Sequence, residues 1–299
     1  MMNNIKLTVF TPAYNRAHTL PRTYKSLCDQ TNKNFIWMIV DDGSTDNTKD
    51  LVKEWQSADN GFEIQYFYKK NGGMHTAHNK AYENIKTELN VCIDSDDAMP
   101  DDAVEKILTF WKEHGSDKVA GIVALDADME GNVLGTELPK DFTQTTTTRL
   151  YGKLGVTGDK KFIYRTEIIN SVESYPEFEG EKLVPLGFKY NLVARDYEML
   201  LMNDVVCLVD YQADGSTNTI YKQYMQSPRG FAAANTVSMQ YSESFVNRIK
   251  SLVHYIAECR IAKDTNWLKN SPRKILTLLL YPLGFAAEKY IRYVNRRSK

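Results

Sequence analysis

Three aspartates stand close together where an apolar run of the sequence ends. The run covers residues 89–93, and it is followed directly by Asp94, Ser95, Asp96 and Asp97. Carboxylates at this spacing repel one another, so the cluster costs stability unless a cation neutralises it. Their oxygens suit a hard divalent ion such as Mg²⁺ or Mn²⁺, which in proteins often holds phosphate groups. The alternative is the acidic start of a helix, because Pro100 and two further aspartates follow.

Polar residues also follow two other apolar segments. Residues 35–40 are typical of a buried strand and lead into Asp41 and Asp42, while residues 5–10 lead into the polar and aromatic segment 11–16. In open α/β sheets, ligands bind beyond the carboxyl ends of the strands. These strand ends together predict one shared site that fits a nucleotide, although an aspartate-stabilised turn explains any single one of them.

Strand and helix patterns alternate through the first part of the chain. Strands are predicted at 5–11, 35–41, 62–69 and 89–95, and helices at 18–30, 46–58, 74–86 and 101–114. This alternation predicts an α/β fold with a parallel sheet and right-handed crossovers. Beyond it we expect strands at 119–125 and 205–210, a short hairpin around 130–132, and regular structure at 162–169. Irregular structure is expected at 143–148 and 175–190, and helices from 228 to 263. In that last region the residues at helical spacing, expected in the core, are Phe245, Ile249, Leu252, Val253 and Ile256.

The three strand-end motifs carry a family resemblance. The segments Thr11-Pro-Ala-Tyr-Asn-Arg16, Asp41-Asp-Gly-Ser-Thr-Asp46 and Asp94-Ser-Asp-Asp97 resemble the signature set of family 2 glycosyltransferases, which are inverting enzymes with the GT-A fold. The resemblance implies a Rossmann-like, mostly parallel central sheet with helices on both faces and a C-terminal helical extension. It implies a catalytic domain at 1–225, with a nucleotide-binding half at 1–115 and an acceptor-binding half at 116–225, followed by the extension at 226–299.

The resemblance also implies roles for individual residues. Asp41 would accept a hydrogen bond from a uracil base on which Tyr14 stacks, and Tyr14 could instead simply pack in a turn. Asp94 would support the ribose, and Asp96 and Asp97 would bind Mn²⁺ or Mg²⁺, which assists departure of the diphosphate. The full set implied to bind the nucleotide sugar is Thr11, Pro12, Tyr14, Asp41, Asp42, Gly73, His75, Asn79, Asp94, Ser95 and Asp96.

A glycine turn at residues 72–73 leads into a helix whose first amides are suited to a phosphate. Where the family often has arginine or lysine, this chain has Met74 and His78. Contacts to the phosphates are therefore expected either to be weaker or to come from His75, for which an ordinary surface histidine is the alternative. Asn79 either contributes to the same site or stabilises the loop.

An inverting transfer needs a base that takes the proton of the acceptor hydroxyl. The acidic segment 178–183 matches the family's position for it, which makes Glu181 the candidate and Glu179 the alternative. The family commonly has aspartate there. Lys182 beside Glu181 favours an ionised carboxylate. A solvated acidic loop would give the same sequence. Residues 210–218, which are small and polar, are expected to form a loop that closes over the donor.

Composition excludes several classes of protein. The net charge of −1 argues against a general nucleic-acid binder. The four cysteines are widely separated and form neither a disulfide framework nor a zinc motif, and Cys28 and Cys92 are expected as core thiols. The N-terminus does not read as a signal peptide, so we expect a cytoplasmic protein.

The C-terminal region is apolar from residue 275 to 287 and has cations on both sides. A bilayer-spanning helix needs about 20 apolar residues, so this stretch is too short to cross a membrane. Residues 272–297 are therefore predicted either as an interfacial helix on an anionic membrane surface or as a helix docked on the domain with a basic tail.

These features predict an enzyme that moves one sugar from a UDP-sugar to a lipid-linked or oligosaccharide acceptor in cell-surface polysaccharide synthesis, at the inner face of the plasma membrane. A single addition is expected because the chain lacks the Gln-x-x-Arg-Trp motif of processive members. A sugar-1-phosphate nucleotidyltransferase is the alternative enzyme, but it needs a glycine-rich loop where this chain has the bulky segment 12–16. A binding module without catalysis is the other alternative, and nothing in the sequence favours it.

Overall fold

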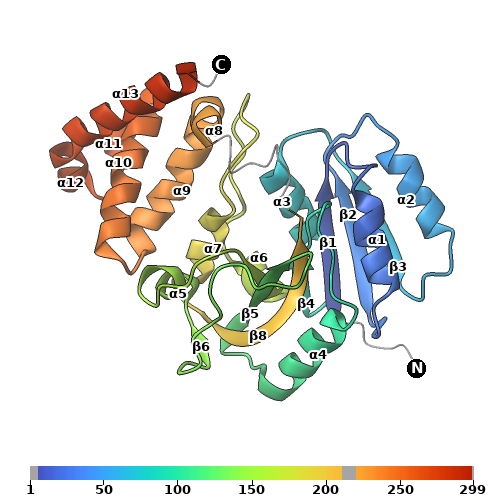
Figure 1. Ribbon diagram of the computed structural model, residues 1–299. Coiled ribbons are helices and arrows are strands. Elements are labelled where there is room, and N and C mark those ends of the chain that lie inside the picture. The colour runs from blue at the N-terminus through green and yellow to red at the C-terminus, as the bar shows by residue number, and fades with distance from the viewer. Residues whose placement is uncertain (1–5, 211–219, 298–299) are drawn as a thin grey trace. The chain divides into compact units, whose positions relative to one another are not determined.

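The computed structural model describes residues 6–210 and 220–297 (Figure 1). These residues form two compact units. Unit 1 comprises residues 6–146, 154–172 and 197–210, and unit 2 comprises residues 147–153, 173–196 and 220–297. The catalytic domain predicted at 1–225 and the extension predicted at 226–299 do not coincide with these two units. The predicted division is functional, and it stays a prediction.

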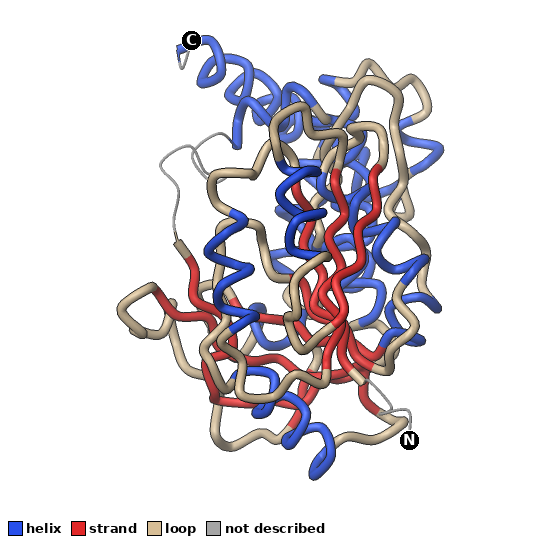
Figure 2. The backbone as a smooth tube through the Cα atoms, turned by 90° about the vertical axis from the view of Figure 1, so that its right-hand side faces the viewer, coloured by secondary structure: helices blue, strands red, loops and turns tan. Residues whose placement is uncertain are grey.

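Unit 1 is built on one sheet, in which the described strands have the order β3-β2-β1-β4-β7-β5-β8-β6. The strands are β1 (Leu7–Ala13), β2 (Phe35–Asp41), β3 (Glu63–Tyr68), β4 (Leu89–Cys92), β5 (Val119–Asp128), β6 (Gln144–Thr145), β7 (Lys160–Arg165) and β8 (Glu198–Val209). Strands β1 to β4 are parallel, and so are β5 and β8. Strand β7 is antiparallel to both of its neighbours, and β6 is antiparallel to β8. Figure 2 shows the strands in red.

The strand order reverses beside β1. From β1 the chain moves outward to β2 and then to β3, and β4 comes back to the other side of β1. In open α/β sheets, ligands bind at this reversal, beyond the carboxyl ends of the two strands that flank it. The residues that follow β1 and β4 therefore stand at the expected ligand site of the fold.

Helices cover both faces of the sheet (Figure 1). On one face, α1 (Leu20–Cys28), α2 (Thr48–Gln56) and α4 (Ala103–His114) share one apolar cluster with the strands, and the Trp37 and Trp55 rings stack in it. The other face carries α3 (Met74–Asn84), with α6 (Thr166–Ser171) against it. There the Phe10 ring meets the His78 and Tyr82 rings edge-on. Burial on both faces explains why the central strands read as continuous apolar runs.

Unit 2 is helical within its described residues. Its helices are α5 (Thr147–Gly152), α7 (Gly187–Val193), α8 (Ile220–Gln226), α9 (Pro228–Tyr241), α10 (Phe245–Ile261), α11 (Trp267–Asn270), α12 (Lys274–Leu279) and α13 (Tyr281–Arg297). Helix α10 packs against both α9 and α13. Helix α13 comes close because residue 284 is glycine, where a Cβ atom would stand 2.4 Å from the side chain of Ile256. No helix in the described ranges is long and apolar enough to cross a bilayer.

The α/β fold and the alternating elements of the first 115 residues are confirmed. Several later predictions were wrong in part. Segment 143–148 is not a loop, since it holds β6 and the start of α5, and α7 begins within the segment 175–190. Strand β8 starts at residue 198 instead of 205. Its register against β5 shifts more than once, and such irregularities blur the alternation that marks a strand in sequence.

Five side chains expected in the core are more exposed than predicted. On α10, Phe245 is 72% exposed at the first position, and Ile249 and Val253 are half-buried. Leu252 and Ile256 of the same helix are buried as expected. Cys28 and Cys92 are half-buried because they end α1 and β4. All four cysteines are free thiols.

The carboxylate of Glu258 on α10 is fully buried in unit 2. It accepts hydrogen bonds from the Asn235 amide at 2.9 and 3.2 Å, and His254 lies 3.6 Å away. Burial raises the pKa of Glu258 to about 7. The folded state therefore keeps a proton that the unfolded state has lost, and the stability of the fold falls as the pH rises from about 4.5 to 7.

The substitution Glu258→Gln removes this titration and keeps an acceptor for Asn235. We expect the variant to match the parent near pH 5 and to be more stable by about 2 kcal/mol at pH 8. Urea unfolding at both pH values measures the difference. Glu243→Gln, at a partly exposed glutamate, is the matched control. If Glu258→Gln changed the free energy of unfolding equally at both pH values, the burial argument would be contradicted.

Candidate functional site

The segment that follows β1 is tied to the segment that follows β2. The amide of Asn15 donates to the Ser44 hydroxyl at 2.8 Å, and the Asn15 side chain accepts from the amide of Thr45. Asn15 takes a positive φ of 54°, a conformation that asparagine tolerates better than most residues. Tyr14 beside it remains 48% exposed, which leaves part of its ring open to stacking, and its role stays a prediction.

The two polar side chains deepest in this region face inward. Thr11 is buried, and its hydroxyl accepts a hydrogen bond from the Trp37 indole at 3.0 Å. Asp41 is also buried and accepts from the Ser44 amide at 2.7 Å and from the Tyr66 hydroxyl at 2.5 Å. Asp41 thus lies at the floor of the region, held in one orientation.

Asp42 organises the glycine turn before α3. Its carboxylate accepts from the amides of Gly72 and Gly73 at 2.9 and 2.7 Å, and it forms an ion pair with Lys69 at 2.6 Å. Gly73 has a φ of 95°, which favours glycine. The amides of the turn itself thus bind a carboxylate of the protein, and the role predicted for the first amides of α3 stays a prediction.

Replacing Asp42 with alanine should destabilise the fold. The change leaves the Lys69 ammonium without its buried partner and leaves two amides unsatisfied, which predicts a loss of about 3 kcal/mol. Thermal or urea unfolding tests this. Asp50→Ala, at the exposed ion pair with Lys53, is the control and should cost less than about 1 kcal/mol. Equal effects at both positions would contradict the assigned role of Asp42.

The acidic loop after β4 alternates between accessible and buried side chains. Asp94 and Asp96 are half-buried, whereas Ser95 and Asp97 are buried. The strand itself ends at Cys92, so the loop continues the alternation without being part of the sheet. Burial and the nearby Asp94 carboxylate raise the pKa of Asp96. The charge of Arg16 opposes this rise without cancelling it.

Asp97 has a different environment. One of its carboxylate oxygens lies 3.8 Å from the Lys161 ammonium and 3.6 Å from the Cys207 thiol, and Lys161 also lies 3.9 Å from Asp126. Burial raises the pKa of Asp97 to about 7 and that of Asp126 to about 6, despite the opposing effect of Lys161. Asp97 was expected to bind the metal ion, but its carboxylate is turned into the interior toward Lys161.

Helix α1 holds the backbone of the acidic loop. The Thr23 hydroxyl donates to the Asp97 carbonyl at 2.7 Å, and the Arg22 guanidinium donates to the Asp96 carbonyl at 3.0 Å. The same guanidinium pairs with Asp210, directly after β8, at 2.5 Å. The rest of the loop expected at 210–218 lies outside the described residues.

The sequence did not reveal several of these supporting residues. Lys161 and Asp126 lie on β7 and β5, where further charged residues, such as Lys160 and Asp128, hide any signal that they are buried. Lys69, Tyr66 and Arg22 carried no signal that separated them from surface residues.

The structure brings nearly all predicted site residues together in unit 1. Pro12 and Ser95 are buried beside the strand ends, and Asn79 lies on α3. His75 is buried in the first turn of α3, so the alternative of a surface histidine is excluded. The strand ends at the reversal of the sheet thus carry an exposed aromatic ring, a buried carboxylate and two half-buried carboxylates. Among the described residues, no group of three or more His, Cys, Asp or Glu side chains forms a complete metal site.

Glu181 belongs to unit 2. Its carboxylate accepts from the amides of Arg229 and Gly230 at 3.2 and 3.0 Å, at the start of α9, and pairs with the Arg229 guanidinium at 2.8 Å. The paired cation is therefore Arg229 and not the neighbouring Lys182, which is exposed. Glu179, the alternative, is exposed.

Similar proteins with curated descriptions are bacterial glycosyltransferases. The chain is 35% identical over 107 residues to the putative teichuronic acid biosynthesis glycosyltransferase TuaG of Bacillus subtilis, which covers 36% of this chain and 42% of that protein. It is 32% identical over 121 residues to the glycosyltransferase GlyA of Streptococcus pneumoniae, covering 40% of this chain and 17% of that protein. The chain thus spans less than half the length of these relatives.

Solved structures share the fold. The S. aureus TarS 1–349 structure aligns with a TM-score of 0.60 at 18% identity, covering 98% of this chain and 92% of that one. TarS 1–349 has also been solved with UDP and with UDP-GlcNAc. The mannosyltransferase PcManGT from Pyrobaculum calidifontis, in complex with GDP-Man and Mn²⁺, aligns with a TM-score of 0.56 at 16% identity, covering 94% of this chain and 73% of that one. The shared architecture is the GT-A fold.

The family model described as glycosyl transferase family 2 matches residues 8–172, which is more than half of the chain. The matched segment includes β1 to β4, the glycine turn and the acidic loop. These are the elements that form the site at the reversal of the sheet. The chain therefore belongs to glycosyl transferase family 2.

Proposed function

We propose that this protein is a metal-dependent, inverting glycosyltransferase that moves a single sugar from a UDP-sugar to a lipid-linked or glycan acceptor of the cell surface. The observation that carries the proposal is the pair of accessible carboxylates, Asp94 and Asp96, at the reversal of the sheet. Tyr14, exposed beside them, would stack on the base, and Asp41 would read its edge. The TarS complexes with UDP and UDP-GlcNAc support a uridine donor.

The chemistry of the acidic loop fits a divalent cation. Asp94 and Asp96 supply oxygen ligands. Burial raises the pKa of Asp96, and so does the charge of Asp94, which a cation would offset. We place the ion on Asp96 with Asp94 beside it, because the Asp97 carboxylate is directed at Lys161. When bound, Mn²⁺ or Mg²⁺ would stabilise the negative charge of the departing diphosphate. Mn²⁺ accompanies the donor in the PcManGT structure.

Glu181 would act as the base for the acceptor hydroxyl. Its carboxylate pairs with the Arg229 guanidinium at 2.8 Å. The hydrogen bonds to α9 hold the carboxylate in one orientation, and a fixed base is more effective than a mobile one. Inversion follows if the acceptor attacks the anomeric carbon directly, with no covalent intermediate on the protein.

Unit 2 carries a surface suited to an anionic membrane. The region predicted as one interfacial helix forms two, α12 and α13, with exposed apolar side chains that include Ile275, Leu278, Leu279 and Leu283. Between residues 273 and 297 the chain has six cations and one acid. Apolar side chains among cations are typical of peripheral binding to anionic lipid. We propose that this surface holds the enzyme at the inner face of the plasma membrane, where a lipid-linked acceptor is available.

Calorimetric titration with UDP tests the donor site. We expect UDP to bind, and Mn²⁺ to tighten binding at least about tenfold, because Asp94 and Asp96 would hold an ion whose charge offsets that of the diphosphate. ADP and GDP measure the preference for the base. The absence of UDP binding, or identical binding with and without Mn²⁺, would defeat the donor assignment. Release of pyrophosphate from UTP and a sugar 1-phosphate would instead support a nucleotidyltransferase.

A further inference from the structure

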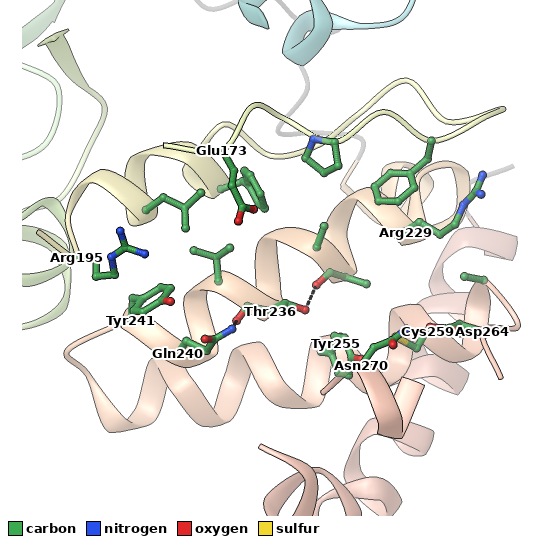
Figure 3. A pocket seen from close by; sticks show the side chains of 18 residues that line it. Glu173, Arg195, Arg229, Thr236, Gln240, Tyr241, Tyr255, Cys259, Asp264 and Asn270 are labelled. Atoms are coloured by element: carbon green, nitrogen blue, oxygen red, sulfur yellow. Dashed lines mark hydrogen bonds between the residues drawn. The ribbon is translucent and has the colours of Figure 1, made fainter. Parts of the chain in front are cut away.

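Unit 2 contains a cavity of about 760 Å³ that has no role in the donor site. Figure 3 shows its lining, with helix α9 along the middle. One face of α9 forms the floor, because Ala232, Ala233, Thr236, Val237 and Gln240 recur at helical spacing. The segment 173–178 and α7 form one wall, and α10 forms the other. A volume of this size lies within the range of small-molecule sites, roughly 300–1,000 Å³.

The middle of the cavity is apolar. Its walls contribute Pro176, Phe188, Leu192 and Ala262, and its floor consists mostly of alanine and valine side chains. Thr236 and Gln240 share this floor, and their side chains donate to carbonyl oxygens of α9 itself at 2.9 and 3.2 Å. The lining also includes two arginines, Arg195 beside Tyr241 and Arg229 toward the other end of α9, and two acids, Glu173 and Asp264 (Figure 3).

Two aromatic rings of the lining already face a guanidinium, and the Phe188 ring lies 6.1 Å from that of Tyr175. The Arg229 guanidinium lies 5.4 Å from the centroid of the Phe178 ring, and the Arg195 guanidinium lies 5.6 Å from that of the Tyr241 ring. Tyr255 is buried, and its hydroxyl donates to the Trp267 carbonyl. A sugar would need such a ring face for stacking, so the lining favours a hydrocarbon over a glycan.

One of the rim cations is available to an anion. Among the described residues, the ion-pair partner of Arg195 is its exposed neighbour Asp196, at 2.5 Å. Ion pairs between exposed side chains contribute little, so a ligand phosphate can displace the aspartate at small cost. Arg229, in contrast, holds the more buried Glu181. The cavity thus combines an apolar channel with a guanidinium at one end.

We propose that this cavity binds the hydrocarbon chain of the lipid-linked acceptor, with its phosphate at Arg195. The inference rests on the proposed function, because it identifies where that acceptor is held. It gives unit 2 two separate lipid contacts, namely the surface of α12 and α13 for the membrane and the cavity beside α9 for one acceptor molecule.

Farnesyl phosphate is a suitable probe, and calorimetry on the full chain measures its binding. We expect one saturable site per chain. Ala233→Leu fills the channel and should weaken binding at least about tenfold, while Ala234→Leu, next to it on α9 but outside the lining, should change it less than about twofold. Arg195→Gln should weaken farnesyl phosphate about fivefold and leave farnesol unchanged, since only the phosphate reaches that residue.

Circular dichroism and UDP binding, measured on every variant, show whether each one is folded. Leu279→Glu on α12 should reduce binding to phosphatidylglycerol vesicles without changing the binding of farnesyl phosphate, which separates the cavity from the surface.

Equal binding by the Ala233→Leu and Ala234→Leu variants would overturn the proposal. So would displacement of the probe by an oligosaccharide, or equally tight binding of dihexanoyl phosphatidic acid, which would indicate a glycan or a membrane phospholipid. If UDP binds and farnesyl phosphate does not, the cavity assignment fails and the donor site stands. If UDP does not bind, the proposed function fails as well.

Discussion

Replacing Asp96 with asparagine is expected to lower kcat about a thousandfold with the fold intact. Asparagine keeps the shape of the side chain and removes the negative charge that would hold the divalent ion. Preorganised charge at a leaving group is commonly the largest single contribution to catalysis, on the order of 10²- to 10³-fold for one group. Release of UDP, measured over a range of Mn²⁺ concentrations, should show a higher half-saturating concentration of the ion together with the lower rate.

The matched control is Asp101→Asn, an exposed aspartate in the segment that leads to α4. It changes the net charge by the same amount near the same loop, and it should leave kcat and the Mn²⁺ dependence unchanged. Asp97→Asn separates the two assignments of the metal ligand. If Asp97→Asn abolished the response to Mn²⁺ and Asp96→Asn preserved it, the placement of the ion on Asp96 would be incorrect.

Glu181→Gln should reduce turnover by a similar factor, for a different reason. A positioned general base contributes about 10²- to 10⁴-fold, and glutamine cannot accept the proton of the acceptor hydroxyl. Binding of UDP should be unchanged because Glu181 belongs to unit 2 and the donor residues to unit 1. Loss of one acceptor at the start of α9 should also cost about 1 kcal/mol of stability.

Two controls distinguish the chemical role of Glu181 from its structural one. Arg229→Gln breaks the same ion pair but keeps the carboxylate, so it should retain much more activity than Glu181→Gln at equal stability. Glu179→Gln tests the alternative base and should be nearly silent. If Arg229→Gln and Glu181→Gln lost activity equally, Glu181 would be a helix cap whose loss disturbs the acceptor side. The pH dependence of kcat in the parent and in Arg229→Gln offers a second check on the ionised base.

The strand-end motifs were predictable from the sequence because each is local. An apolar run that ends in Asp41 or in Asp94 fixes both the strand and the place where its polar residues emerge, and parallel pairing then gathers those ends at one edge. The same reasoning located the first four helices to within a few residues. Alternation of side chains along the chain also places Asp94 and Asp96 on one side of the acidic loop and Asp97 on the other. Alternation does not say which side is buried, and the structure shows that it is the side of Asp97.

The partners of these motifs were not predictable, since they are brought in from distant parts of the chain. Lys161 is 64 residues beyond Asp97 in sequence, and it faces Asp97 only because β7 inserts antiparallel between β4 and β5. Antiparallel insertion has no periodic signature that separates it from a further parallel strand. The Lys69–Asp42 pair likewise depends on the register of β3 against β2.

The chain passes from unit 1 into unit 2 and back into unit 1, and this order affects how the protein folds. Strand β8, which follows a long excursion of the chain into unit 2, supplies Val206 and Cys207 to the same apolar cluster as β1. A fragment truncated at residue 172 would therefore leave β5 with an unpaired edge, and unpaired edges promote aggregation. During synthesis on the ribosome, the nucleotide-binding sheet cannot be completed until almost three quarters of the polypeptide has emerged, so the two units are expected to mature together rather than one after the other.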